Sequence, residues 1–120
     1  MKPATFAPVY LTLFPRLSDI ANKYGYALAA HGSLQRDMDL VAIPWTVDAK
    51  DQFELIEAFR NYLMTFCDIF SAGLHGPERK AHGRLAWMIQ TGLGSAIDLS
   101  VMPRIMDGPN AETTQTKDLC

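Results

Sequence analysis

Three aspartates of this chain lie in or beside apolar segments. Asp37 and Asp39 occur at the start of the apolar run 38–45, and Asp98 lies inside a second apolar run, 96–103. Side chains alternate between the two faces of a strand, so Asp37 and Asp39 should point to the same side. Two carboxylates held this close repel each other unless a proton or a cation lies between them. The spacing therefore indicates a cation site.

Asp98 strengthens this hypothesis because a carboxylate within a buried strand is costly to desolvate. If the two strands are neighbours, the three carboxylates form an oxygen-rich site that suits Mg²⁺ or Mn²⁺. Such ions hold phosphates, activate a hydroxyl and stabilise a leaving pyrophosphate. A structural alternative pairs Asp37 with Arg36 in an exposed turn. In that alternative, Asp98 pairs with Arg84 or Arg104.

Four further residues are candidates for contacts with a phosphate. Gly32 allows the backbone to approach an anion closely, and Ser33 offers a hydroxyl and an amide as donors. Arg36 follows in the next turn, and Arg84 begins a later apolar segment. The basic segment 75–84 could contribute in the same way. For this segment and for Arg36, the alternative is a solvated surface.

Hydrophobic periodicity predicts the elements that position these residues. We expect a helix within 14–26, strands at 26–31 and 38–45, a helix at 49–66, a loop at 71–83, and strands at 84–90 and 96–103. Pro15 suits the first turn of the first helix. Residues 40–43 are continuously apolar, which predicts a strand covered on both faces.

This order of elements predicts an α/β (α+β) domain in two or three layers. Its sheet should be small and mixed, with about four strands and with flanking helices on at least one face. The 120 residues suffice for one domain, which we place at 1–106. Residues 107–120 contain hardly any apolar side chains and are expected to form a flexible C-terminal tail.

Composition excludes several classes of protein. A net charge of −2 and a pI near 5.8 argue against a broad basic surface for duplex nucleic acid. The two cysteines, Cys67 and Cys120, have neither zinc-ligand spacing nor an evident disulfide partner. No apolar stretch is long enough for a signal peptide or a membrane span. We therefore expect a cytoplasmic protein without membrane contact.

The order of these motifs resembles that of the nucleotidyltransferase superfamily typified by DNA polymerase beta. Members carry a Gly-Ser or Gly-Gly after the first core strand, then an Asp-x-Asp, then a third acidic residue on a later strand. The corresponding positions here are 32–33, 37–39 and Asp98, and the resemblance covers roughly 15–104. It implies a nucleotidyltransferase-like fold that moves a nucleoside monophosphate from an NTP to a hydroxyl acceptor and releases pyrophosphate.

The resemblance also implies a role for each matching residue. Asp37 and Asp39 would bind both metal ions, and Asp98 would help with one of them and activate the attacking hydroxyl. Gly32 and Ser33 would contact the phosphates of the NTP. The cofactor implied is Mg²⁺ or Mn²⁺; the acceptor, whether protein, nucleic acid or small molecule, is not specified.

Two features depart from the family pattern. The connection 34–36 is shorter than usual and suggests a tight hairpin, and no separate acceptor domain follows Asp98. Small stand-alone members tend to work as homo-oligomers or with a partner protein, and this chain could do the same. The alternative function is a catalytically silent module on the same fold, which binds a nucleotide, a nucleic acid or a protein, as a phage accessory protein could.

Overall fold

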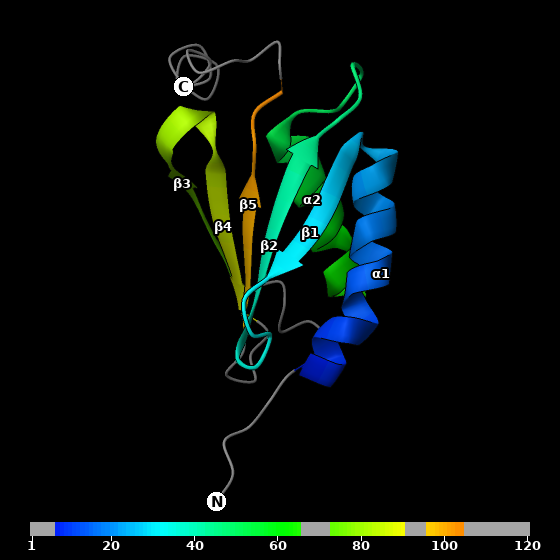
Figure 1. The fold of residues 1–120 in the computed structure, drawn as a ribbon, viewed down its shortest axis with the longest axis vertical. Coiled ribbons are helices and arrows are strands. Elements are labelled where there is room, and N and C mark those ends of the chain that lie inside the picture. Colours follow the sequence, from blue (N-terminus) through cyan, green and yellow to red (C-terminus); the bar gives the residue numbers. More distant parts are fainter. Residues whose placement is uncertain (1–6, 66–72, 91–95, 105–120) are drawn as a thin grey trace, which may run out of the picture.

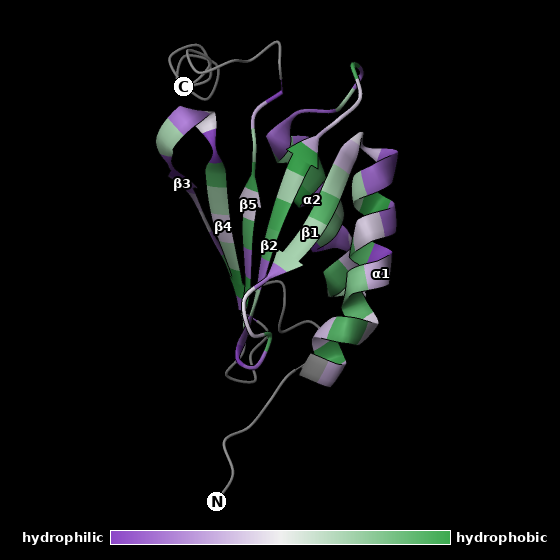
Figure 2. Ribbon diagram, in the orientation of Figure 1, coloured by the Kyte–Doolittle hydropathy of each residue, from purple (hydrophilic) through white to green (hydrophobic). Residues whose placement is uncertain are grey.

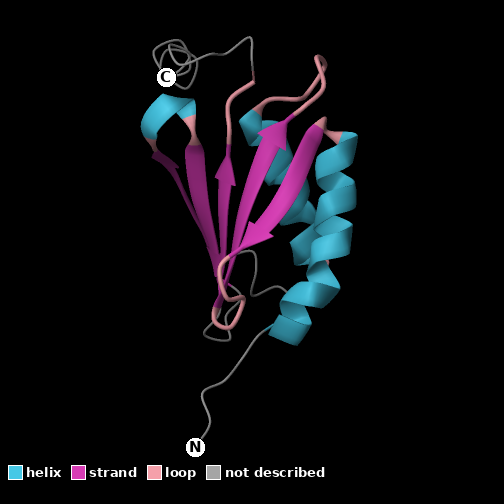
Figure 3. Ribbon diagram, in the orientation of Figure 1, coloured by secondary structure: helices cyan, strands magenta, loops and turns pink. Residues whose placement is uncertain are grey.

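The computed structural model describes residues 7–65, 73–90 and 96–104. In chain order the elements are α1 (Ala7–Lys23), β1 (Tyr26–His31), β2 (Asp37–Pro44), α2 (Gln52–Met64), β3 (Leu74–Arg79), the short 3-10 helix η2 (Ala81–Gly83), β4 (Leu85–Gln90) and β5 (Ala96–Val101). The strands form one five-stranded sheet in the order β1-β2-β5-β4-β3. Among these strands only β2 and β5 are parallel neighbours, and both α-helices lie on the same face of the sheet (Figures 1 and 3). The predicted class, a small mixed sheet with flanking helices, is confirmed.

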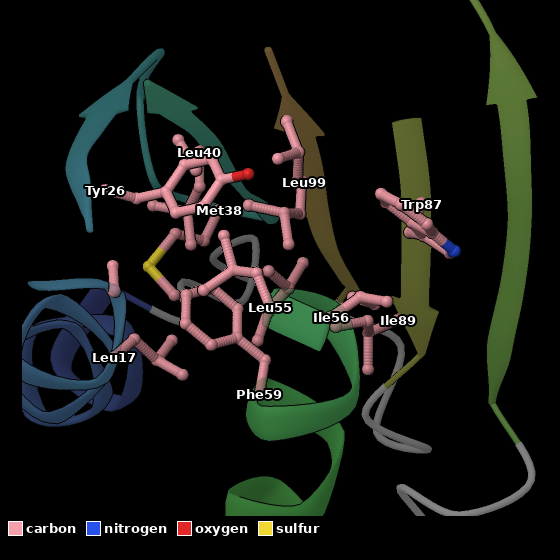
Figure 4. Close-up of a cluster of buried hydrophobic side chains, with 14 of the residues drawn as sticks. Leu17, Tyr26, Met38, Leu40, Leu55, Ile56, Phe59, Trp87, Ile89 and Leu99 are labelled. Carbon is pink, nitrogen blue, oxygen red and sulfur yellow. The ribbon is translucent and has the colours of Figure 1, made fainter. Parts of the chain in front are cut away.

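The core fills the space between the sheet and the two helices. Hydrophobic residues concentrate along the central strands (Figure 2), and alternate side chains of these strands point toward the helices (Figure 4). Completely buried members include Leu17 of α1, Leu55 and Phe59 of α2, Met38 and Leu40 of β2, and Leu99 of β5. Each such side chain contributes about 1.5–3 kcal/mol when it is removed from water. The core therefore determines which face of each strand remains outside.

No helix of the described residues lies on the opposite face of the sheet, so within this part of the chain the prediction that β2 is covered on both faces was wrong. Val41 is half-buried on this face, and Ile43 is exposed. A run of consecutive apolar residues does not distinguish a second covering layer from an open, concave surface. The second face of β2 is therefore available to a ligand.

The first helix begins earlier than its sequence suggested, and Pro15 lies inside it. Proline removes a backbone donor and disfavours the interior of a helix, which made residue 14 the apparent start. Tyr10 and Leu13 precede it and are both buried. Their contacts with the core extend α1, while Pro15 lies on its exposed side.

The predicted loop at 71–83 is partly a strand. β3 pairs antiparallel with β4, and its register shifts between His75 and Glu78. Gly76 and Pro77 occupy this irregular part, where an edge strand tolerates them. A Cβ atom at Gly76 would lie 2.8 Å from the Ala86 carbonyl oxygen, so the close approach of β3 to β4 requires glycine. The predicted tail at 107–120 lies outside the described residues.

Gln52, at the start of α2, joins the helix to the far end of the sheet. Its completely buried amide donates hydrogen bonds to the carbonyls of Gly83, at 3.1 Å, and Val101, at 2.7 Å. The preceding residue, Asp51, caps the helix by accepting a hydrogen bond from the Glu54 amide at 2.8 Å. Among the described residues, no helix is long and apolar enough to cross a membrane.

Replacing Gln52 with Leu should destabilise the protein because it leaves two buried carbonyls without this donor. We expect the free energy of unfolding to fall by about 1–3 kcal/mol, measured by urea denaturation. The exposed Gln35 provides a control, and Gln35→Leu should change stability by less than about 0.5 kcal/mol. Equal effects of the two substitutions would contradict this role of Gln52.

Candidate active site

The register of the sheet brings Asp39 and Asp98 together. β2 and β5 run parallel with Asp39 opposite Asp98, and on the other side of β2 His31 lies opposite Asp39. Paired residues of neighbouring strands lie about 4.8 Å apart. Both aspartates are half-buried on the open face, since the residues that flank each of them along its strand point into the core.

Asp37 extends this carboxylate cluster, which we define as Asp37, Asp39 and Asp98. Asp37 pairs with Ala96 two residues before Asp39, so its side chain lies on the same face of β2. It is exposed, whereas the other two members are half-buried. The three aspartates named from the sequence thus occupy two adjacent strands and one face of the sheet.

The hairpin between β1 and β2 lies directly against this cluster. Gly32 has a φ of +82°, and a Cβ atom there would lie 2.7 Å from Oδ2 of Asp39. Ser33 and Arg36 are exposed, and the Ser33 hydroxyl accepts a hydrogen bond from the Gln35 amide at 3.3 Å. The phosphate candidates of this hairpin therefore lie at the same end of the sheet as Asp37.

Tyr10 of α1 holds the hairpin in place. Its hydroxyl donates to the Arg36 carbonyl and lies 3.3 Å from the Ala96 carbonyl oxygen. These two carbonyls belong to the residue before β2 and to the first residue of β5. Tyr10 therefore fixes the ends of both strands that carry the cluster, a role that the sequence did not reveal.

The open face is hollowed into a cleft of about 470 Å³ that reaches from β1 to β3. Asp39 and Asp98 lie on its floor with Val41 and Met88, and β3 forms the far wall. The cleft is lined by His31, Asp39, Val41, His75, Glu78, Lys80, Arg84, Ala86, Met88, Asp98 and Ser100, among others. Its size falls within the range typical of small-molecule sites, about 300–1,000 Å³.

Arg84 lies in this cleft without an ion pair to Asp98. Its Nη1 donates to the Ser100 hydroxyl at 2.7 Å. Across residues 7–65, 73–90 and 96–104, the ion pairs join Arg60 with Glu57 and Lys80 with Glu78. The structure therefore does not contain the ion pairs of the structural alternative that join Arg36 with Asp37 and Arg84 with Asp98.

The surroundings of Asp98 disfavour its charged form. Burial raises the pKa of Asp98, and the charges of Asp39 and Asp37 raise it further, against the opposing effect of Lys80 and Arg84. None of the three aspartates has a side-chain hydrogen bond within the described ranges. A cation placed among them would relieve both the repulsion and the desolvation.

The donor chemistry of the cluster fits Mg²⁺ or Mn²⁺, which prefer carboxylate oxygens and retain several waters. As they stand, no three His, Cys, Asp or Glu side chains of the described residues converge closely enough to hold a metal ion. Asp39 and Asp98, adjacent in the register, would provide the protein oxygens nearest to such an ion, and Asp37 lies beyond them on the same face.

The sequence indicated the floor of this site better than its far wall. The sequence places Lys80 in a basic segment for which a solvated loop is the alternative, and it gives no signal for Glu78. Their place in the cleft depends on the irregular pairing of β3 with β4, which no pattern in the local sequence indicates. The sequence predicts strands at 84–90 and 96–103, which correspond to β4 and β5. Their antiparallel pairing brings Arg84 close to Ser100.

Comparison with models of known protein families and with characterised proteins finds no match to this chain.

Asp98→Asn should stabilise the folded protein at neutral pH. A carboxyl group whose pKa is raised by folding destabilises the folded state as the pH rises above its ordinary value of 3.8. The variant should therefore have the higher melting temperature at pH 7, in buffer with a metal chelator, and this advantage should shrink as the pH falls toward about 4. Asp48→Asn, which removes the same charge from an exposed loop, is the control for the loss of a charge. An equal gain in melting temperature at every pH for Asp98→Asn would contradict this explanation.

Gly32→Ala tests the contact between the hairpin and the cluster. The positive φ should lower the free energy of unfolding by about 1–2 kcal/mol, and the added methyl group should displace the Asp39 carboxylate. We expect weaker binding of Mn²⁺ to the folded variant, measured by water-proton relaxation well below its melting temperature. Unchanged Mn²⁺ affinity would show that the Asp39 position does not depend on Gly32.

Proposed function

We propose that this protein is a metal-dependent nucleotidyltransferase that moves a nucleoside monophosphate from an NTP to a hydroxyl acceptor. The observation that carries the proposal is the pairing of Asp39 with Asp98 across parallel strands, with Asp37 on the same face. Asp39 and Asp98 line a cleft of the right size for a small molecule, and none of the three carboxylates forms an ion pair with another described residue. The Gly32-Ser33 pair directly follows β1, as in the family that the sequence resembles.

Each residue has a role in this proposal. Asp37, Asp39 and Asp98 would hold Mg²⁺ or Mn²⁺, which when bound lowers the charge of the triphosphate and stabilises the leaving pyrophosphate. An oxygen of the Asp98 carboxylate accepts the proton of the acceptor hydroxyl, and the hydroxyl oxygen of the acceptor forms the new bond to the α-phosphorus. Its raised pKa suits this step, since a base works best when its pKa approaches the working pH. The bond from the α-phosphorus to the bridging oxygen breaks, and pyrophosphate leaves.

The hairpin would bind the triphosphate. Gly32 presents its backbone beside Asp39, and Ser33 and Arg36 are exposed next to the cluster. Arg84 supplies positive charge from the opposite side of the cleft. A protein that consumes NTP works where NTP is abundant, which agrees with the cytoplasmic location expected from the sequence.

A catalytically silent binding module remains the second candidate. It is favoured by the short hairpin of residues 32–36 and by the separation of potential metal ligands within the described part of the chain. Such a module would keep the cleft and the open face but would bind its ligand without a metal ion.

Metal-dependent binding of NTP separates the two candidates. Thermal unfolding should be measured with Mg²⁺ or Mn²⁺ and each NTP, for the wild type and for Asp37→Asn/Asp39→Asn. A ligand at about 100 times its Kd stabilises the folded state by about 2.7 kcal/mol, which raises the Tm by about 10 °C. We expect this increase in the wild type only with metal present, and its loss in the double variant.

The matched control is Asp19→Asn/Asp48→Asn, which removes the same charge from exposed positions. It should retain the increase in Tm. The increase should be accompanied by release of pyrophosphate when an acceptor is supplied. If no NTP raises the Tm with any metal, while the double variant remains folded, the transferase proposal fails and the silent module is supported.

A further inference from the structure

The cleft extends beyond the carboxylate cluster to a second charged end. Arg84 and Lys80 line the cleft there together with Asp98 and Ser100, and the Arg84 guanidinium binds the Ser100 hydroxyl. The Gly32-Ser33 hairpin is at the opposite end of the strands (Figure 1). The acidic floor is therefore flanked along the strand direction by two different groups of phosphate donors.

The turn between β3 and β4 holds Arg84 firmly. The Lys80 amide donates to the Arg84 carbonyl at 2.8 Å, and the Arg84 amide donates to the Ala81 carbonyl at 3.4 Å. His82 and Gly83, with φ values of 64° and 79°, close the turn. Because Gln52 also binds the Gly83 carbonyl, the backbone that carries Arg84 is attached to the core.

Donors remain available at this end of the cleft. A guanidinium has five N–H groups, and that of Arg84 uses one to bind the Ser100 hydroxyl. Ser100 lies two residues after Asp98 on the same face of β5. Lys80 is paired with Glu78 at 2.7 Å, but the Glu78 side chain is largely exposed, so this pair exchanges readily with solvent or ligand.

Apolar side chains border Asp98 and Ser100 on the floor of the cleft. Val41 and Ala86 flank Ser100 in the register, and Met88 flanks Asp98. No charged side chain from β2, β4 or β5 separates the Asp98 carboxylate from the Arg84 guanidinium. Asp98 and Ser100 are about 6.6 Å apart along the strand. This distance suits a molecule whose hydroxyl and anionic group are separated by a few carbon atoms.

We propose that Arg84, Ser100 and Lys80 bind the phosphate group of the acceptor, and that the acceptor is a small sugar phosphate. Its hydroxyl would then lie at Asp98, and its carbon skeleton would cover the apolar floor. The identification as an acceptor rests on the proposed transferase function, whereas the phosphate subsite itself does not. The phosphate of the NTP is the other possible occupant of the same donors, and the test separates the two.

The first arm measures the subsite alone. ¹⁵N-labelled protein is titrated with ribose 5-phosphate in the presence of a chelator, and with ribose as the control without phosphate. We expect amide shifts at Arg84 and Ser100 with ribose 5-phosphate only. Arg84→Gln should weaken binding about tenfold or more, whereas Arg60→Gln, which removes the same charge from the outside of α2, should not.

Asp37→Asn/Asp39→Asn is the matched variant for the other end of the cleft. It should bind ribose 5-phosphate at least as tightly as the wild type, because it removes negative charge and leaves Arg84 in place. The spectrum of each variant reports whether it is folded. No shift with ribose 5-phosphate, or equal binding by Arg84→Gln, would overturn the subsite.

The second arm tests the acceptor role with a non-hydrolysable NTP and Mg²⁺. If both ligands bind at once, the sugar phosphate occupies a separate subsite, as proposed. If they compete, the donors serve the triphosphate, and the acceptor assignment is overturned. If the NTP does not bind at all while ribose 5-phosphate does, the transferase function fails and the acceptor role with it, but the subsite stands.

Discussion

The parallel pairing of β2 with β5 is the constraint on which the site depends. Parallel neighbours cannot be joined by a tight turn, so α2, β3 and β4 all lie between them in the sequence. The pairing places Asp39 beside Asp98, and a slip of one residue would turn one of the two carboxylates into the core. The buried side chains of β2 and β5 prevent such a slip. Packing on one face of the sheet thus fixes the chemistry on the other.

Two polar side chains of the helices hold the ends of these strands. Tyr10 of α1 binds backbone carbonyls where β2 and β5 begin, and Gln52 of α2 binds the carbonyl of Val101 where β5 ends. Both side chains are completely buried. A buried polar group without a hydrogen-bond partner destabilises the folded state. The Tyr10 hydroxyl and the Gln52 amide therefore strongly favour the arrangement in which they bind these carbonyls. The two helices therefore position the strand ends as well as covering the core.

Much of the fold could be predicted from local sequence. Alternation in a strand placed Asp37 and Asp39 on one face, and glycine and proline marked the ends of β1 and β2. The apolar residues around Asp98 identified β5. These predictions depend on patterns within a few residues, which is the range over which periodicity carries information.

The remaining features depend on contacts between distant segments. The Gly76-Pro77 pair indicated a loop, but pairing with β4 makes its surroundings a strand. Nothing in the run 40–43 could show that its second face is open. The positions of Lys80 and Arg84 in the cleft follow from the order of the strands, and this order was not predicted. The sequence thus indicated which residues form the site better than it indicated the shape of the cleft.

The irregular course of β3 also affects how the protein meets copies of itself. An outermost strand usually offers a row of unpaired amides and carbonyls onto which another chain can add. In β3, Pro77 has no amide hydrogen to offer, the register is interrupted, and Glu78 and Arg79 are exposed. These features block the addition of a further strand at this border of the sheet. The distortion that builds the wall of the cleft thereby also protects the protein from aggregation through β3.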